Sequence, residues 1–299
     1  MVVPGSVANL GAGFDTLGVA VQLYLRARIA DVREDSGGKL SVVKSAPPVH
    51  AGNALERAFA LAVGRTGRRA PSVAVEVESD IPMAAGLGSS AAATVAGLRV
   101  FERVTRPLND DELLALATDV EGHADNAAPA LFGGLTSVIA DEAHHPVALR
   151  WTWPDELRLV VATPAVKLAT AKARAALPEM LPRRDAIFNM QRVLSLVHAL
   201  QEKDYARVRE AVRDRWHQPA RAALVPQLRE TLALQDPDVL GAFLSGAGPS
   251  VAVIARRGFE RLEQLLSAQY ARAGVQVVVR TLSVHHAPVL TGASVGRTA

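Results

Sequence analysis

The chain of 299 residues carries 33 Lys and Arg against 30 Asp and Glu, a formal net charge of +3, and contains no cysteine. The lack of cysteine excludes disulfides, thiolate metal ligands and a cysteine nucleophile. The small net charge and the aromatic content of only 4% argue against a nucleic-acid-binding surface. A chain of this length, 49% hydrophobic, has room for a large core and commonly divides into two domains.

Periodicity predicts a mixture of strands and helices in the first half of the chain. Alternating or extended patterns predict strands over 19–31, 40–43, 73–78 and 132–139. Helical spacing of apolar residues predicts helices over 53–63 and 109–120, the second capped by Asn109. A further helix is expected to open at Ser89, where an alanine-rich run begins.

The periodic pattern breaks over 141–154, which contains two prolines and two tryptophans. We therefore place a domain boundary there, giving domains 1–150 and 151–299. The second half is predicted to contain strands over 157–162, 251–254 and 275–284, and helices over 185–200, 204–216 and 258–271. This alternation favours an α+β fold in which helices pack on sheets.

Targeting signals are not apparent in the sequence. No stretch reaches the roughly 18 consecutive apolar residues of a membrane helix, and the N-terminus lacks the basic and apolar regions of a signal peptide. We expect a cytoplasmic protein with no membrane and no nucleic-acid partner.

The segment from Asp80 to Ala93 is the most informative part of the sequence. It joins the strand at 73–78 to the alanine-rich helix through Gly86 and Gly88, which let the backbone approach a ligand closely. Ser89 and Ser90 lie at the start of that helix, where free N–H groups and the helix dipole favour phosphates. Taken alone, the segment is equally consistent with a well-capped helix after a tight turn.

This loop is neither of the common nucleotide-binding loops. A Walker A loop requires a lysine, and none occurs between Lys44 and Lys167. A Rossmann fingerprint requires a third glycine that is missing here. The loop instead resembles, without a gap from Pro82 to Ala92, the Pro-x-x-x-Gly-Leu-Gly-Ser-Ser-Ala-Ala motif of the GHMP small-molecule kinases. The resemblance implies ATP binding by Pro82, Gly86, Leu87, Gly88, Ser89, Ser90, Ala91 and Ala92, with Asn53 near the adenine.

Four further polar segments each have an ordinary structural explanation when considered singly. They are the glycine-rich loop 9–18, the helix end Glu121-Gly-His-Ala-Asp-Asn126, the arginines Arg192 and Arg221, and the glycine loop 244–250. The helix end could bind a metal, position a hydroxyl or cap a turn. The arginines could be solvated, and each loop could be a plain turn.

Together, and in this order, these segments resemble the homoserine kinases of the GHMP family over most of the chain. The resemblance implies a two-domain fold, with an N-terminal domain like ribosomal protein S5 and a C-terminal ferredoxin-like α/β sandwich. It also implies transfer of the γ-phosphoryl group of ATP to the hydroxyl of L-homoserine, giving O-phospho-L-homoserine for threonine biosynthesis. A homodimer is an expectation from the family.

The resemblance also assigns roles to individual residues. Mg²⁺ is expected on Glu121 with Ser89 or Ser90, since this ion takes few protein oxygens. Arg192 and Arg221 are expected to bind the substrate carboxylate and Asp15 its ammonium group. The remaining substrate contacts are assigned to Asn9, His123 and Gly246.

Catalysis is expected to depend on positioning, because phosphoryl transfer asks little covalent chemistry of the protein. Asn126 is the candidate for orienting the attacking hydroxyl, and the adjacent Asp125 is the competing candidate. The sequence departs from the family pattern in three places. The chain starts later than usual, which implies either a shortened first strand or a misassigned start codon. A glycine occupies position 5, and Ala220 replaces an aromatic residue.

Other functions remain alternatives at this point. Another GHMP kinase, such as a mevalonate or galactose kinase, is disfavoured by the paired arginines and by a first lysine only at Lys39. A non-catalytic binding protein would not need Glu121, Asn126 and both arginines. A metalloenzyme built on the histidine pairs at 144–145 or 285–286 lacks ligand-spaced partners.

Overall fold

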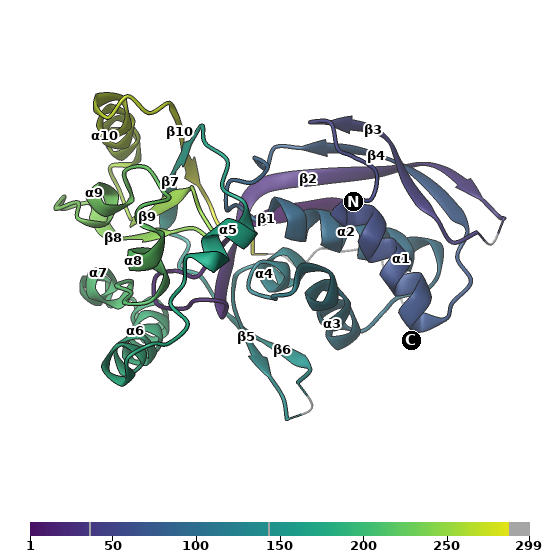
Figure 1. Ribbon diagram of the computed structural model, residues 1–299, viewed down its shortest axis with the longest axis horizontal. Helices are drawn as coiled ribbons and strands as arrows, with labels where there is room; N and C mark the ends of the chain where they lie inside the picture. The colour runs from purple at the N-terminus through teal and green to yellow at the C-terminus, as the bar shows by residue number, and fades with distance from the viewer. Residues whose placement is uncertain (36, 143, 287–299) are drawn as a thin grey trace.

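The computed structural model describes residues 1–35, 37–142 and 144–286, which form two sheets side by side with helices packed on them (Figure 1). The first sheet has the order β3-β4-β2-β5-β6, with β1 pairing to β2. All its pairings are antiparallel except β3 with β4. Its strands are β1 (Val2–Ala8), β2 (Leu17–Arg33), β3 (Leu40–Ala46), β4 (Ser72–Ser79), β5 (Leu135–Ala140) and β6 (Pro146–Trp151).

The helices of the first half lie together beneath this sheet in Figure 1. They are α1 (Ala54–Thr66), α2 (Ser89–Val104), α3 (Asp110–Glu121) and α4 (Ala127–Phe132). The apolar sides of these helices and of the strands form one continuous core, in which Phe59 of α1 meets Phe101 of α2 edge to face. Asn53 and Asn109 cap α1 and α3, and α3 begins with a full capping box.

The second sheet is antiparallel throughout, with the order β10-β7-β9-β8. Its strands are β7 (Arg158–Pro164), β8 (Val239–Leu244), β9 (Val251–Ala255) and β10 (Val277–Leu282). A chain order of strand, helices, two strands, helix and strand with this spatial order is the ferredoxin-like arrangement. Its helical segments are α5 (Thr170–Ala175), α6 (Arg183–Gln201), the 3₁₀ turn η1 (Tyr205–Arg207), α7 (Val208–Ala211), α8 (His217–Arg221), α9 (Leu228–Leu232) and α10 (Phe259–Arg272).

The fold class predicted from the sequence is confirmed, and so are the long periodic elements. The helix predicted over 204–216 is wrong beyond α7, because the Asp214 carboxylate accepts from the backbone N–H groups of Trp216 at 3.0 Å and Gln218 at 2.7 Å. These bonds turn the chain into α8 instead. The strand predicted from residue 132 begins at Leu135, since 127–132 forms the buried helix α4.

The region assigned to the domain boundary contains a strand that the sequence did not predict. β6 begins at Pro146 and, among the strands of the described residues, pairs only with β5, an edge position that tolerates proline. The first sheet therefore ends at Trp151 and the second begins at Arg158. The division into 1–150 and 151–299 stays a prediction, and its residues 287–299 lie outside the described part of the chain.

Gly97 tests the close packing of α2 on α1. A Cβ at this position would lie 2.2 Å from the Leu55 carbonyl oxygen, so Gly97→Ala is expected to force the helices apart and destabilise the protein by about 1–3 kcal/mol. Gly64 on α1 is the matched control, because a Cβ there meets nothing within 4 Å. Gly64→Ala should stabilise by up to about 1 kcal/mol through helix propensity. Urea unfolding of both variants measures these differences, and equal effects would contradict the packing argument.

Candidate active site

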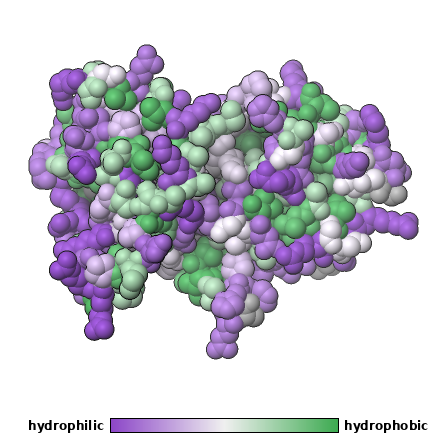
Figure 2. Space-filling model, in the orientation of Figure 1, coloured by the Kyte–Doolittle hydropathy of each residue, from purple (hydrophilic) through white to green (hydrophobic). Residues whose placement is uncertain are grey.

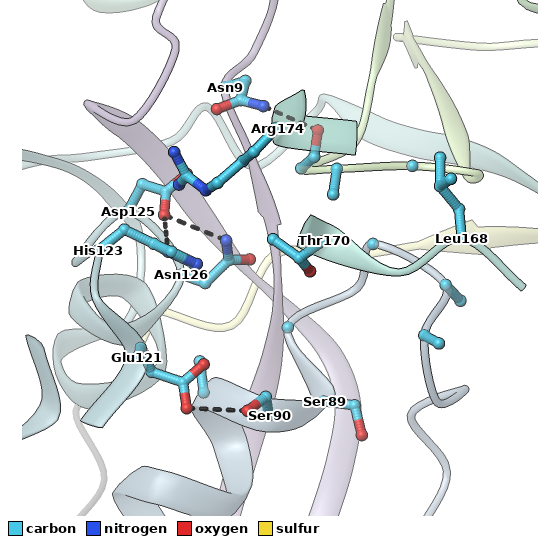
Figure 3. Close-up of a pocket in the computed structure, with 18 of the residues that line it drawn as sticks. Asn9, Ser89, Ser90, Glu121, His123, Asp125, Asn126, Leu168, Thr170 and Arg174 are labelled. Carbon is cyan, nitrogen blue, oxygen red and sulfur yellow. Dashed lines mark hydrogen bonds and ion pairs between the residues drawn. The ribbon is translucent and has the colours of Figure 1, made fainter. Parts of the chain in front are cut away.

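A cavity of about 130 Å³ lies where the loops of the two sheets meet, in the hollow between the two halves of the molecule (Figures 2 and 3). Its walls come from the β1–β2 loop, the loop before α2, the α3–α4 connection, α5, α8 and the β8–β9 turn. The lining residues are Asn9, Phe14, Asp15, Ala84, Ala85, Gly86, Gly88, Ser89, Ser90, Ala91, Glu121, His123, Asp125, Asn126, Leu168, Thr170, Arg174, Arg221, Gly246, Ala247 and Gly248.

The N-terminus of α2 opens into this cavity without a side-chain cap. Gly88 is the N-cap residue in the left-handed conformation, and the first intrahelical bond runs from the Ala92 N–H to the Gly88 carbonyl. The N–H groups of Ser89, Ser90 and Ala91 therefore precede the helical ladder. Such an end of a sixteen-residue helix favours an anionic ligand.

Two glycines of this loop have close neighbours that exclude a side chain. A Cβ on Gly86 would lie 2.3 Å from the Ser245 carbonyl oxygen, and a Cβ on Gly88 would lie 2.1 Å from the Ser6 hydroxyl. Both glycines also have φ near +70°, where other residues are strained. The loop is thus packed closely between β1 and the β8–β9 turn.

Glu121 is held at the end of α3 by two hydroxyl groups of α2. Ser90 donates at 2.8 Å and Thr94 at 2.6 Å, both to the same oxygen, Oε1. No described residue donates to Oε2, which leaves it available as an oxygen ligand. In Figure 3 Ser90 points to Glu121 while the hydroxyl of Ser89 points away. A carboxylate and a hydroxyl are hard oxygen donors and fit a hard cation.

A hydrogen-bonded network joins His123, Asp125 and Asn126 in the middle of the cavity wall (Figure 3). The Asp125 carboxylate accepts from His123 Nδ1 at 2.8 Å and from Asn126 Nδ2 at 3.2 Å. The bond to Asp125 raises the pKa of His123, against the opposing effect of burial. Asp125 itself is buried and accepts both bonds on the same oxygen, Oδ1.

Arg221 is 2% exposed and has only neutral partners among the described residues. Its guanidinium donates to the carbonyl oxygens of Ala173 and Gly246, both at 3.1 Å, and its Nη1 lies 3.4 Å from His217 Nδ1. Burial, and then the nearby Arg174, lower its pKa. A buried guanidinium with no carboxylate in ion-pair distance within the described chain is suited to an anionic ligand.

Arg174 of α5 forms a bidentate ion pair with Asp15 of the β1–β2 loop, at 2.8 and 2.9 Å. This pair raises the pKa of Arg174. This ion pair joins the second half of the chain to the first across the cavity. One positive and one negative side chain therefore lie next to each other beside Arg221. Arg174 was not among the residues predicted from the sequence. Its only sequence signal is that three basic residues, Lys167, Lys172 and Arg174, follow a buried strand within a short segment.

The structure brings most of the predicted site residues together, but not Arg192. Its guanidinium pairs with Glu210 at 2.6 Å, lies over the Phe188 ring at 4.1 Å, and does not line the cavity. Thr94, which was also not predicted as a site residue, lies one helical turn after Ser90 on the same face of α2.

The other predicted nucleotide contacts lie around the loop. Leu87 and Ala92 are buried behind it, and Pro82 precedes it. Asn53 caps α1 and lines a second, smaller hollow of about 50 Å³. That hollow has mostly apolar walls and shares Ser89 with the main cavity.

Both halves of the chain match domains of one known protein family. Residues 49–134 match the GHMP kinases N-terminal domain and residues 196–271 match the GHMP kinases C-terminal domain. The chain belongs to the GHMP kinase family. As a member of this family it is an ATP-dependent kinase. No helix in the described part of the chain is long and apolar enough to cross a membrane.

Similar proteins are homoserine kinases. The chain is 39% identical to homoserine kinase of Solibacter usitatus over 272 residues, covering 88% of this chain and 87% of that one. It is 40% identical to that of Deinococcus radiodurans over 252 residues, covering 83% and 81%. The crystal structure of homoserine kinase from Cytophaga hutchinsonii superimposes with a TM-score of 0.83 at 26% identity, covering 96% of this chain and 94% of that one.

The His123–Asp125 bond predicts a pH dependence of stability. The pKa of His123 is raised above its ordinary 6.5 in the folded protein. The stabilisation of the fold by the His123–Asp125 interaction is therefore complete below about pH 6.5 and is lost as the pH rises through the pKa that His123 has in the folded state. The difference in unfolding free energy between the wild type and His123→Gln should therefore shrink as the pH rises from 5.5 to 8.5. Urea unfolding across this range measures it, and Asp125→Asn should abolish the trend. A difference that grows with pH would refute the assignment.

Proposed function

We propose that this kinase transfers the γ-phosphoryl group of ATP to the side-chain hydroxyl of L-homoserine, giving O-phospho-L-homoserine. The observation that carries the proposal is that the described residues place no carboxylate in ion-pair distance of the buried Arg221, which lies in the same cavity as the N-terminus of α2. One end of the cavity is thus suited to a carboxylate and the other to phosphates. Relatives and a structural neighbour that are homoserine kinases support the same substrate.

The phosphates of ATP would lie on the backbone N–H groups of Ser89, Ser90 and Ala91. Glu121 Oε2 and the Ser90 hydroxyl would hold Mg²⁺, which supplies charge neutralisation for the phosphoryl oxygens when bound. The apolar hollow beside Asn53 is the proposed place of the adenine, since it adjoins Ser89 at the edge of the phosphate loop. Met83 and Val77 are among its walls.

Homoserine is a zwitterion and needs opposite charges at its amino-acid end. Arg221 and Arg174 would bind its carboxylate, because guanidinium groups match carboxylates in bidentate geometry. Asp15 would bind its ammonium group, with Asn9 and the Gly246 carbonyl at the same end of the cavity. Arg174 takes the role expected of Arg192, which pairs with Glu210 outside the cavity.

The acceptor hydroxyl would then lie against Asn126 and Asp125, between the amino-acid end and the phosphates. Asn126 Nδ2 orients the hydroxyl, and Asp125 is the neighbouring carboxylate toward which its proton would point. This arrangement favours catalysis by alignment and charge stabilisation. A homodimer and a cytoplasmic location stay predictions.

The proposal is tested by measuring ADP release with ATP and Mg²⁺ across L-homoserine, L-serine, L-threonine, mevalonate and galactose. We expect strong turnover with homoserine and little with the others. Turnover with mevalonate or galactose instead would favour another GHMP kinase; a mevalonate kinase shares the fold, with a TM-score of 0.69 at 15% identity. No turnover in folded protein would refute the proposal.

Three arginine variants test the carboxylate site. Arg174→Met and Arg221→Met should each raise KM for homoserine by about 10- to 100-fold, because each removes a charge-assisted hydrogen bond to the carboxylate. Arg192→Met, the matched control, should change KM less than about threefold, since Arg192 pairs with Glu210 and does not line the cavity. Steady-state kinetics at saturating ATP measures the three. A large effect confined to Arg192→Met would overturn this account of the pocket.

A further inference from the structure

Ser6 of β1 is a buried hydroxyl that contacts the candidate site without lining its cavity. The residue has no exposed surface, and its Oγ lies 2.9 Å from Asn126 Oδ1. Its backbone N–H donates to the Leu87 carbonyl at 3.1 Å. Ser6 therefore sits between the phosphate loop and the amide proposed to orient the acceptor.

The neighbours of Asn126 determine which way its amide faces. Asp125 Oδ1 lies 3.2 Å from Nδ2 and already accepts from His123. A carboxylate oxygen can only accept, so the amide nitrogen must face it, and the flipped amide would set two acceptors against each other. The amide oxygen then faces Ser6, and the Ser6 hydroxyl must donate to it.

This polarity decides what Asn126 can offer to the cavity. Because Oδ1 is turned toward Ser6 and one N–H of Nδ2 is bonded to Asp125, the second N–H of Nδ2 is the donor left for a ligand. A donor aimed at the substrate binds a lone pair of its hydroxyl oxygen. The hydroxyl proton must then point elsewhere, and the nearby Asp125 is an acceptor.

The phosphate loop holds Ser6 in place. A Cβ on Gly88 would lie 2.1 Å from the Ser6 hydroxyl, so the absence of a side chain at Gly88 provides the space that this hydroxyl occupies. A Cβ on Gly5 would lie 2.9 Å from the Leu87 carbonyl oxygen, so the glycine that departs from the family pattern permits close approach of the same loop. The hydroxyl is thereby fixed between loop and amide.

We propose that Ser6 is a positioning residue, which fixes the Asn126 amide so that its N–H, and not its oxygen, faces the acceptor hydroxyl. This inference rests on the proposed function, because it deepens the role of Asn126 in it. Removal of the Ser6 hydroxyl leaves a buried acceptor unpaired and releases the amide from one of its two constraints.

A double-mutant cycle tests the inference. Ser6→Ala should lower kcat about tenfold while KM for ATP changes less than about twofold, and Ser6→Thr, which retains the hydroxyl, should restore most of kcat. In the Asn126→Ala background, Ser6→Ala should cost less than about twofold more, because the two residues act as one unit. A second tenfold loss in that background would show that Ser6 acts independently of Asn126 and would overturn the proposal.

A measurement without turnover separates this inference from the proposed function. The side-chain amide resonances of Asn126 in the substrate-free protein, observed by ¹H–¹⁵N NMR, should shift and exchange faster with solvent in Ser6→Ala than in the wild type or Ser6→Thr. Unchanged resonances would overturn the role of Ser6. If the wild type phosphorylates another alcohol but not homoserine, the proposed function fails, while the cycle and the spectra still test Ser6 with that alcohol.

Discussion

The contact between two glycine loops sets the geometry of the whole site. The Ser245 hydroxyl donates to the Gly86 carbonyl at 2.5 Å, and the Ser250 N–H donates to the Ala85 carbonyl at 3.2 Å. This contact joins the loop before α2 to the β8–β9 turn, and thus one half of the molecule to the other. It is possible only because Gly86 carries no side chain, and it fixes the N-terminus of α2 relative to the Gly246 carbonyl.

The Gly246 carbonyl in turn organises the charged end of the cavity. It accepts from Asn9 at 2.9 Å and from Arg221 at 3.1 Å, so a loop of the first half and a helix of the second meet on one oxygen. Arg221 is buried there with carbonyl partners, which compensate only part of the cost of removing a cation from water. An anionic ligand would compensate the remaining desolvation cost by pairing with the Arg221 guanidinium. Part of the free energy of ligand binding would therefore come from completing the pairing of this buried cation.

An element or site residue could be predicted from the sequence when the residues that determine it lie within its own segment of the chain. The long elements β2, α1, α3, α6 and α10 have periodic patterns or caps within their own segments, and the phosphate loop is one continuous motif. Short elements such as α4, α5 and β6 depend on packing partners elsewhere in the chain. Arg174 was missed for the same reason. Its partner Asp15 lies 159 residues away, and only the fold shows that this arginine rather than Arg192 reaches the cavity.

The arrangement of charges also explains how such a cavity could select an acceptor by length. In Figure 3 Asn9 and Arg174 lie at one end, Asp125 and Asn126 in the middle, and Glu121 with Ser90 at the other end. On the proposed pose, the ion pairs fix the amino-acid end of the substrate, and the helix N-terminus fixes the phosphates. The hydroxyl must span the interval between them. Serine is one methylene shorter than homoserine, so its hydroxyl would fall short of Asn126 when its carboxylate lies on Arg221. Selection then comes from misalignment of the reacting oxygen. For serine, this misalignment would lower kcat more than it raises KM.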